Sequence, residues 1–420
     1  MSSEKALSFL KTYGMQPEAI RPAEMAPLMT REMERGLRGE ACSLAMIPTY
    51  LSDHGDLPMG EPVAVIDAGG TNFRRALVSF TEDGVREEEL KKWKMPGIER
   101  PASWEEFIRF TADAVEPLMD RTDKIGFCFS YSAEITPEMD GRVICIDKEV
   151  VIQGCEGKLV GASLLEELGR RGIHGKKIVI LNDTVAVQLG GLSQRKNGDS
   201  HVIGQVSGTG TNTCCALPED RIGKLGRSSR RRMIVNLESG MYDGIPGGYF
   251  DEKLDRESHN PGQKRFEKLT AGVYLGELCH LMLLKATEDG LLSAGTAEKV
   301  KALGHIDSAV IEAWSMGEKL EQIAQGEEDA DFVRTLCKAM FERSARLMCL
   351  NHAAILLLTG DKSMYAFAEG SLVQKGRYYQ AALERLIREE ISEKLGRELV
   401  LCISDESTLS GSAAAALLNL

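Results

Sequence analysis

One stretch decides the fold of this chain: Val63-Ala-Val-Ile-Asp67-Ala-Gly69-Gly70-Thr71-Asn72-Phe73-Arg74-Arg75-Ala-Leu-Val78. An apolar run typical of a buried strand leads to an acid and two glycines, and a second apolar run follows. The glycines let the backbone reverse with its amides exposed, and Thr71 adds a hydroxyl donor. The stretch therefore predicts a β-hairpin whose turn can hold phosphate, with Asp67 placed to bind Mg²⁺ directly or through water. An ordinary hairpin with a Gly-Gly turn is the alternative interpretation.

A second glycine-rich loop lies far downstream. Residues 201–206 are typical of a short strand, and Ser207-Gly-Thr-Gly-Thr-Asn-Thr213 follows with glycines and hydroxyls that can surround phosphate oxygens. Thr213 stands where a dinucleotide-binding fingerprint has its third glycine, and the chain contains no P-loop motif. This loop is a second candidate phosphate site, and a hydroxyl-rich turn remains the alternative.

Between the two loops, an apolar strand ends in Asn182-Asp183-Thr184. The residues after it continue as a helix, so this triplet occupies the helix N-terminus. An acid at the carboxyl end of a strand in an α/β sheet also lies where ligands bind, which makes Asp183 a candidate general base. Capping of the helix alone is the alternative.

Other patterns outline the rest of the chain. Ser103 and Glu106 predict a capping box ahead of an amphipathic helix. Apolar residues at residues 125–129 predict a strand, and residues 46–51 an extended segment. Long helices are predicted at residues 275–286 and 333–358, and a helix of small residues at residues 411–418.

Composition limits the classes of function. The 420 residues, 43% of them hydrophobic, suffice for two cores, so two lobes with a cleft between them are expected. The net charge of −12 argues against a nucleic-acid partner, and the basic cluster at residues 227–232 is predicted to be a solvated hairpin end. The ten cysteines include no C-x-x-C pair, which indicates reduced core residues. Without a targeting or membrane-spanning pattern, we expect a cytoplasmic protein with no membrane partner.

The order of these motifs resembles the hexokinase family, the sugar kinases of the actin-like ATPase superfamily. The resemblance runs from about Met33 to the end of the chain, and the segment Phe266-Glu-Lys-Leu-Thr-Ala-Gly-Val-Tyr-Leu-Gly-Glu-Leu278 is similar to a family segment almost letter for letter. The other matching motifs are Met33-Glu-Arg-Gly-Leu37, Met46-Ile-Pro-Thr-Tyr50, Asp67-Ala-Gly-Gly-Thr-Asn-Phe-Arg74, Phe127-Cys-Phe-Ser130, Leu181-Asn-Asp-Thr-Val185, Gly208-Thr-Gly-Thr-Asn212, Asn236-Leu-Glu238 and Asn260-Pro-Gly-Gln263.

The resemblance implies a two-lobed α/β fold of the actin-like ATPase (ribonuclease H-like) type. It places the smaller lobe at residues 61–183 and 405–420 and the larger lobe at residues 1–60 and 184–404. It implies transfer of the γ-phosphate of ATP to the 6-hydroxyl of glucose or a related hexose, with Mg²⁺ and with Asp183 as the general base. The oligomeric state is left open.

The resemblance also implies roles for individual residues. Catalysis is assigned to Asp183 and Lys148, and Mg²⁺ to Asp67 and Asp183 through water. The residues expected to bind the hexose are Ser130, Asp147, Asn182, Asn212, Glu238, Lys264 and Glu267. The residues expected to bind ATP are Asp67, Gly69, Gly70, Thr71, Asn72, Arg74, Gly208, Thr209, Gly210, Gly272, Gly370, Ser371 and Thr408.

Several positions depart from the family pattern. Asp147 replaces a threonine, Lys264 a glutamine and Ser239 a tryptophan, and Glu369 replaces an aspartate in the adenosine segment. Asp147 and Lys264 are opposite in charge, and we hypothesise that they compensate each other. These departures motivate one alternative function, a non-catalytic sugar sensor of the same fold.

Overall fold

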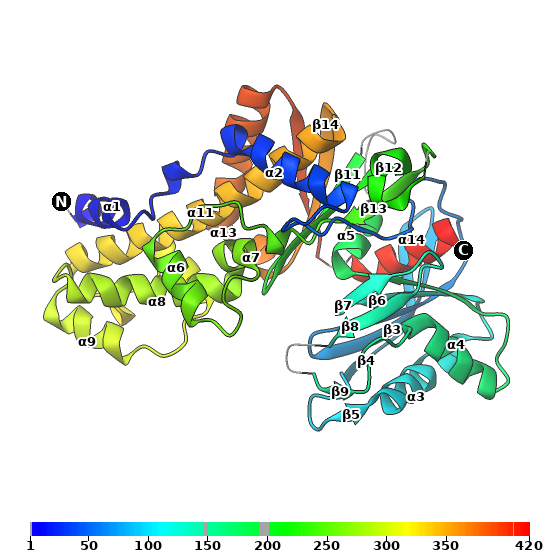
Figure 1. The fold of residues 1–420 in the computed structure, drawn as a ribbon. Helices are drawn as coiled ribbons and strands as arrows, with labels where there is room; N and C mark the ends of the chain where they lie inside the picture. Colours follow the sequence, from blue (N-terminus) through cyan, green and yellow to red (C-terminus); the bar gives the residue numbers. More distant parts are fainter. Residues whose placement is uncertain (1, 147–149, 193–200, 228, 406) are drawn as a thin grey trace. The chain divides into compact units, whose positions relative to one another are not determined.

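In the computed structural model, the structure describes residues 2–146, 150–192, 201–227, 229–405 and 407–420. The chain forms two compact units (Figure 1). The first unit comprises Met1–Ala45, Val206–Asn212 and Glu238–Ile403, and the second comprises Met46–Gln205, Thr213–Leu237 and Ser404–Leu420. Both parts of the predicted smaller lobe lie in the second unit, whereas residues 46–60, 184–205 and 213–237 of the predicted larger lobe lie there as well. The lobe boundaries themselves stay a prediction.

The second unit is built on a five-stranded sheet in the order β10-β6-β2-β3-β4. Strands β2 and β3 form the predicted hairpin, β4 continues it antiparallel, and β6 and β10 run parallel to β2. The bounds are β2 Val63–Gly69, β3 Asn72–Thr81, β4 Gly84–Lys94, β6 Lys124–Phe129 and β10 Lys177–Leu181.

Helices cover both faces of this sheet, as the apolar character of its strands requires. Alternate residues of β2 divide between two cores: Ile66 packs with α3 and α4, whereas Val65 packs with α5 and α14. Figure 1 shows α3 and α4 on one side of this sheet and α5 and α14 on the other. The bounds are α3 Trp104–Val115, α4 Val160–Arg170, α5 Asp183–Gly191 and α14 Thr408–Asn419. The predicted capping box starts α3, where Ser103 and Glu106 exchange hydrogen bonds of 3.2 Å and 2.8 Å. Buried alanines let α14 lie close against α5 and β6.

The other strands that lie wholly or mainly in the second unit belong to other sheets. Strands β1, β13, β12 and β11 are hydrogen-bonded neighbours in that order. Their bounds are β1 Ile47–Pro48, β11 His201–Ser207, β12 Thr211–Pro218 and β13 Arg232–Asn236, and the small pairs are β5 Ala102–Ser103 with β9 Ile152–Gln153 and β7 Ser132–Ile135 with β8 Gly141–Cys145. The extended segment predicted at residues 46–51 contributes only β1, because Met46 and Tyr50 have φ angles of 48° and 59°, outside the range of a strand.

The first unit is mainly helical. Its longest helix, α11, is buried over most of its length and packs against α1, α2 and α13. The helices are α1 Ser2–Thr12, α2 Pro22–Arg38, α6 Tyr249–Glu257, α7 Arg265–Thr270, α8 Gly272–Glu288, α9 Ala294–Ala302, α10 Ser308–Ser315, α11 Glu327–Thr359, α12 Ser371–Lys375 and α13 Arg377–Leu386, with a π-helix at Ile387–Lys394. Strands β14 Ser363–Glu369 and β15 Glu398–Ile403 pair in parallel. Within the described part of the chain, no helix combines the length and apolar character needed to cross a membrane.

Candidate active site

Three parallel strands of the second unit deliver polar residues to one sheet edge. In the register of these strands, Asp67 of β2 pairs with Cys128 of β6, and Cys128 pairs with Leu181 of β10. Ser130 and Asp183 each follow two residues after those partners. Because carboxyl ends of neighbouring parallel strands share an edge, Asp67, Ser130 and Asp183 lie together at the edge where ligands bind in open α/β sheets.

The Asp67 carboxylate is buried and paired. Its Oδ2 accepts a hydrogen bond from Arg74 Nε at 2.9 Å and forms an ion pair with Arg74 Nη2 at 2.8 Å. Burial raises the pKa of Asp67 above its ordinary value; the charge of Asp183 adds to the rise, and Arg74 opposes it. The Asp183 carboxylate therefore acts on Asp67 across this edge of the sheet.

The turn between β2 and β3 is held from outside the hairpin. Gly70 adopts a φ of 56°, which a glycine tolerates without strain. The Tyr131 hydroxyl donates to the Gly70 carbonyl at 3.0 Å, and Met95 N donates to the Thr71 carbonyl at 3.0 Å. The side chains of Thr71 and Asn72 are exposed, so their donors are available to a ligand.

Asp183 begins α5 and leaves one carboxylate oxygen unengaged. Thr184 N donates to Asn182 Oδ1 at 2.9 Å and to Asp183 Oδ1 at 2.7 Å. Among the described residues, no hydrogen-bond donor is found for Asp183 Oδ2. Asn182 is the N-cap, as predicted, and Asp183 retains an oxygen that can accept a proton.

A second group of predicted residues converges in the first unit. Glu267 Oε2 accepts from Thr211 N at 3.1 Å, and Glu267 Oε1 lies 3.5 Å from Lys264 Nζ. Asn212 Oδ1 accepts a hydrogen bond from Ser239 N, next to Glu238, at 3.2 Å. Glu238 and Lys264 both have left-handed backbones, with φ angles of 55° and 52°. Such strained conformations persist where the surrounding structure fixes them, and they cluster at functional sites.

A cavity of about 570 Å³ in the first unit collects predicted nucleotide residues. Its walls include Gly208, Thr209, Gly272 and Ser371. A side chain at Gly208 would approach Ser371 N to 3.1 Å, so these two glycine-rich segments pack backbone against backbone. Such a wall presents amide groups at close range, which suits the phosphates of a nucleotide.

Sequence reasoning missed several polar residues of this cavity. Lys375 and Arg377 stand in its wall, and so do Ser308, Lys319 and His305. Lys375 lies one helical turn beyond Ser371 in α12, so the helical periodicity could have indicated it. Arg377 follows two residues later at the start of α13, whereas Ser308, Lys319 and His305 come from segments distant in the sequence.

Four predicted site residues stand apart from the two groups described so far or bear on the hypothesised charge pair. Asp147 and Lys148 lie outside the described residues. Thr408 is the first residue of α14 in the second unit and is largely buried. Lys264 forms its ion pair with Glu267, and the pairing hypothesised with Asp147 stays a prediction.

The predicted Mg²⁺ ligands fit an indirect mode of binding. Among the described residues, no group of three or more histidine, cysteine, aspartate or glutamate side chains could hold a metal ion. One oxygen of Asp67 is already engaged by Arg74. Mg²⁺ keeps most of its water and commonly takes one or two carboxylates besides phosphate oxygens, so Asp67 and Asp183 fit an ion held mainly by water and phosphate.

The raised pKa of Asp67 gives a testable pH dependence of stability. The folded protein binds the Asp67 proton more tightly than the unfolded chain does. The free energy of unfolding should therefore fall as the pH rises from the ordinary aspartate pKa of 3.8 through the raised pKa of folded Asp67. Asp67→Asn removes the ionisation and keeps an oxygen for Arg74. We expect the melting temperature of Asp67→Asn minus that of the wild type to grow between pH 4 and pH 7.

Thermal unfolding at several pH values measures this difference. Asp123→Asn is the matched control, because Asp123 is exposed just before β6 at the opposite end of the same sheet. A difference that shrinks as pH rises would contradict the cause assigned to the pKa of Asp67.

Known proteins resemble this chain over most of its length. Hexokinase family models match residues 8–192 and residues 202–418. Hexokinase-1 of Schizosaccharomyces pombe is 25% identical over 410 residues, covering 91% of this chain and 84% of the relative. Hexokinase-1 of Oryza sativa subsp. japonica is 28% identical over 443 residues, covering 94% and 87%.

Solved structures share the fold. The hexokinase from Schistosoma mansoni complexed with glucose has a TM-score of 0.78 at 21% identity, covering 99% of this chain and 98% of that one. A further hexokinase crystal structure has a TM-score of 0.82 at 21% identity with the same coverage. The chain thus has the two-domain α/β fold of the actin-like ATPases, as predicted. With family models that together extend from residue 8 to residue 418, the chain belongs to the hexokinase family and is a hexose-phosphorylating enzyme.

Proposed function

We propose that this hexose kinase transfers the γ-phosphate of ATP to the 6-hydroxyl of glucose or a closely related hexose, with Asp183 as the general base. The observation that carries the proposal is the shared sheet edge of Asp67, Ser130 and Asp183, where Asp183 keeps a free oxygen. Asp183 accepts the proton of the 6-hydroxyl while the hydroxyl oxygen attacks the γ-phosphorus, and ADP leaves. No observation favours a non-catalytic sensor.

The hexose is assigned to residues that together supply hydrogen-bond donors and acceptors. Ser130 and Asn182 are near the base, and Asn212, Glu238, Lys264 and Glu267 form the group in the first unit. A polyol requires several such groups, because each buried hydroxyl left without a partner costs about 1–3 kcal/mol. The Schistosoma mansoni hexokinase was solved with glucose, so glucose is the first hexose to test.

The phosphates of ATP are assigned to backbone amides and small hydroxyls. In the second unit these belong to the turn at Gly69, Gly70, Thr71 and Asn72. In the first unit they belong to the cavity walls at Gly208, Thr209, Gly272 and Ser371, and to Gly370, which packs against Gly208. Mg²⁺, when bound with ATP near Asp67 and Asp183, would neutralise part of the charge on the phosphate oxygens.

A substrate panel tests the proposal. Purified protein is incubated with MgATP and glucose, mannose, fructose, galactose or N-acetylglucosamine, and ADP release is followed with the sugar product identified by ³¹P and ¹³C NMR. We expect phosphorylation at the 6-position and glucose among the best substrates. The proposal would be refuted if the phosphate were found on another carbon, or if none of the hexoses in the panel were phosphorylated.

Lys375 in the wall of the cavity gives a second test. Lys375 is exposed in α12, and among the described residues no carboxylate pairs with it. If it contacts a phosphate, Lys375→Met should raise the KM for MgATP by about threefold to tenfold, the net worth of one typical hydrogen bond at an exposed side chain, and leave the KM for hexose unchanged. Initial-rate kinetics at constant ionic strength measure both constants. Lys362→Met, at an exposed lysine before β14, is the control, and an equal effect of both variants would remove Lys375 from the nucleotide site.

A further inference from the structure

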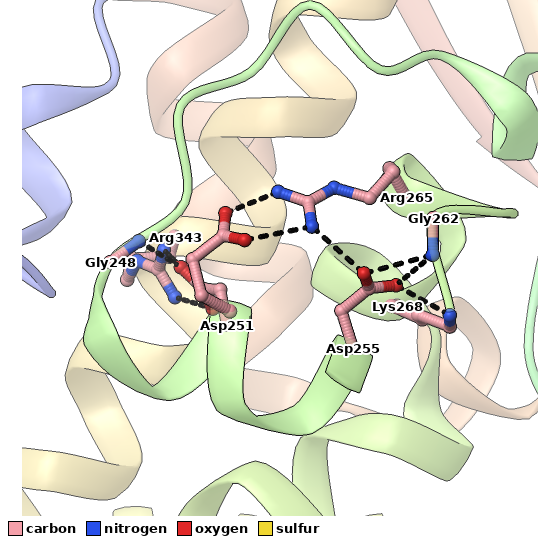
Figure 2. A network of polar contacts seen from close by, with 8 residues as sticks. Gly248, Asp251, Asp255, Gly262, Arg265, Lys268 and Arg343 are labelled. Carbon is pink, nitrogen blue, oxygen red and sulfur yellow. Dashed lines mark hydrogen bonds and ion pairs between the residues drawn. The ribbon is translucent and has the colours of Figure 1, made fainter. Parts of the chain in front are cut away.

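A buried polar network underlies the segment that carries Lys264 and Glu267. The network centres on Asp255, near the end of α6, and Figure 2 shows its contacts. Gly262 N donates to both oxygens of Asp255, at 3.1 Å and 2.9 Å. Lys268 Nζ donates to Oδ1 at 2.6 Å, and Arg265 Nη1 donates to Oδ2 at 3.1 Å. One carboxylate thereby joins the loop that follows α6 to the helix α7 that follows the loop.

Lys268 ties the loop at a second point. Its ammonium group also donates to the Asn260 carbonyl at 2.8 Å, and the residue is only 2% exposed. Arg265 extends the network outward by a double contact with Glu252. Burial alone would raise the pKa of Asp255, but hydrogen bonds from Lys268 and Gly262 bring that pKa below its ordinary value, so the group stays ionised. A buried ion pair is weak support for stability in itself, and a role in fixing one conformation is the better-attested use.

The conformation fixed here is an unusual one. Lys264, between the tied loop and α7, has a φ of 52° and a ψ of 39°, and its carbonyl accepts from Lys268 N at 3.0 Å. Glu267 and Lys268 are adjacent on α7, so their side chains leave the helix about 100° apart. Lys268 enters the network, and Glu267 reaches Thr211 N and Lys264 Nζ. The position of Glu267 therefore depends on the anchoring of its neighbour.

We propose that Asp255 and Lys268 are positioning residues for the hexose: by fixing residues 260–268 they set the place and orientation of Lys264 and Glu267. The proposal rests on the proposed function in assigning Glu267 to the hexose. Neither positioning residue need touch the sugar. A displaced α7 would weaken contacts to the hexose hydroxyls and leave contacts to the nucleotide intact.

Helix α6 contains its own control. Asp251 precedes Asp255 by one helical turn and is buried to a similar degree, at 4% against 7% exposed. Its carboxylate accepts from Arg343 Nη1 at 3.1 Å, from Arg343 Nη2 at 2.6 Å and from Gly248 N at 2.7 Å (Figure 2). Asp251 thus anchors α6 to α11 and makes none of the contacts to residues 260–268.

The experiment compares Asp255→Asn with Asp251→Asn in the full chain. For each variant, kcat, the KM for glucose and the KM for MgATP are measured, together with direct glucose binding by calorimetry and thermal unfolding. We expect Asp255→Asn to weaken glucose binding and raise the glucose KM by about 10-fold to 100-fold, the cost of a displaced contact group, with the MgATP KM within about twofold. Asp251→Asn should destabilise the fold and leave the ratio of the two KM values unchanged.

A milder variant keeps the test decisive if Asp255→Asn does not fold. Arg265→Gln removes one arm of the network at a more accessible side chain, 18% exposed, and should shift the glucose KM in the same direction by a smaller factor. The positioning role would be overturned if Asp251→Asn and Asp255→Asn shifted the glucose KM equally. It would also be overturned if neither Asp255→Asn nor Arg265→Gln shifted the glucose KM. Both outcomes would leave the proposed function standing. A wild-type protein that binds no hexose would instead refute the proposed function and this inference with it.

Discussion

Replacement of Asp183 by asparagine is expected to lower kcat for hexose phosphorylation by about 10²–10⁴-fold, the usual contribution of a general base, while hexose binding persists. The amide oxygen of asparagine can still accept from Thr184 N, as Asp183 Oδ1 does at 2.7 Å, so the start of α5 keeps its hydrogen bond. The amide can hydrogen-bond a sugar hydroxyl but cannot take its proton at neutral pH. The loss should therefore fall on kcat and spare the dissociation constant of the hexose.

Initial rates and glucose calorimetry on the same preparation separate these two quantities. Asp123→Asn makes the same chemical change at an exposed site before β6 and should match the wild type in both. An Asp183→Asn enzyme with a kcat within twofold of the wild type would exclude Asp183 as the base. A variant that loses glucose binding and turnover together would assign Asp183 to binding instead.

The geometry around Asp183 follows from local patterns in the sequence. A buried strand, a polar triplet and a helix are each encoded within about ten residues, and the structure confirms β10, the Asn182 cap and α5. The β2–β3 hairpin is equally local, because a two-residue turn at Gly70 and Thr71 fixes the register of both strands. That register places Asp67 opposite Arg74. The predicted hairpin implies this pairing, but sequence reasoning did not identify the ion pair.

The parts that sequence reasoning missed depend on distant contacts. The wall of the candidate nucleotide cavity contains residues of α8, α10, α12 and α13, and the sequence of one helix does not predict that the others lie beside it. The Asp255 network is missed for another reason. Aspartate and lysine are rarely buried unless they are paired, so from the sequence alone the charged residues of this network are expected on a solvated helix surface. The burial of Asp255 can be inferred only from its charged partners, and one of these, Lys268, is thirteen residues away in the sequence.

Irregular backbone marks a further limit. Residues 46–51 read as extended because their apolar side chains suit a strand, yet the left-handed conformations of Met46 and Tyr50 interrupt it. Glu238 and Lys264 are similar cases beside the candidate hexose residues. Non-glycine residues adopt this conformation at an energetic cost, so propensity predicts against it and tertiary packing decides.

Glu267→Gln is expected to lower kcat/KM for glucose by about 100-fold or more with little change in the KM for MgATP, because a site built to bind a hydroxyl loses most when that bond is broken. The glutamine can keep the contact that Glu267 Oε2 makes with Thr211 N at 3.1 Å, so α7 should hold its place. What disappears is the negative charge near Lys264 and the strong acceptor for a sugar hydroxyl. Glu277→Gln, at an exposed glutamate of α8, controls for the chemical change alone.

Deoxy sugars turn this prediction into a direct assignment of the contact. Wild type and Glu267→Gln are each assayed with glucose and with its 2-, 3- and 4-deoxy analogues. If Glu267 binds one hydroxyl, the analogue lacking that hydroxyl should be impaired in the wild type and hardly impaired further by the substitution, since the interaction can be lost only once. The other analogues should show the full effect of Glu267→Gln in addition to their own. Additive losses with all three analogues would mean that Glu267 contacts none of these hydroxyls, and its effect on kcat/KM would then have to act through Lys264.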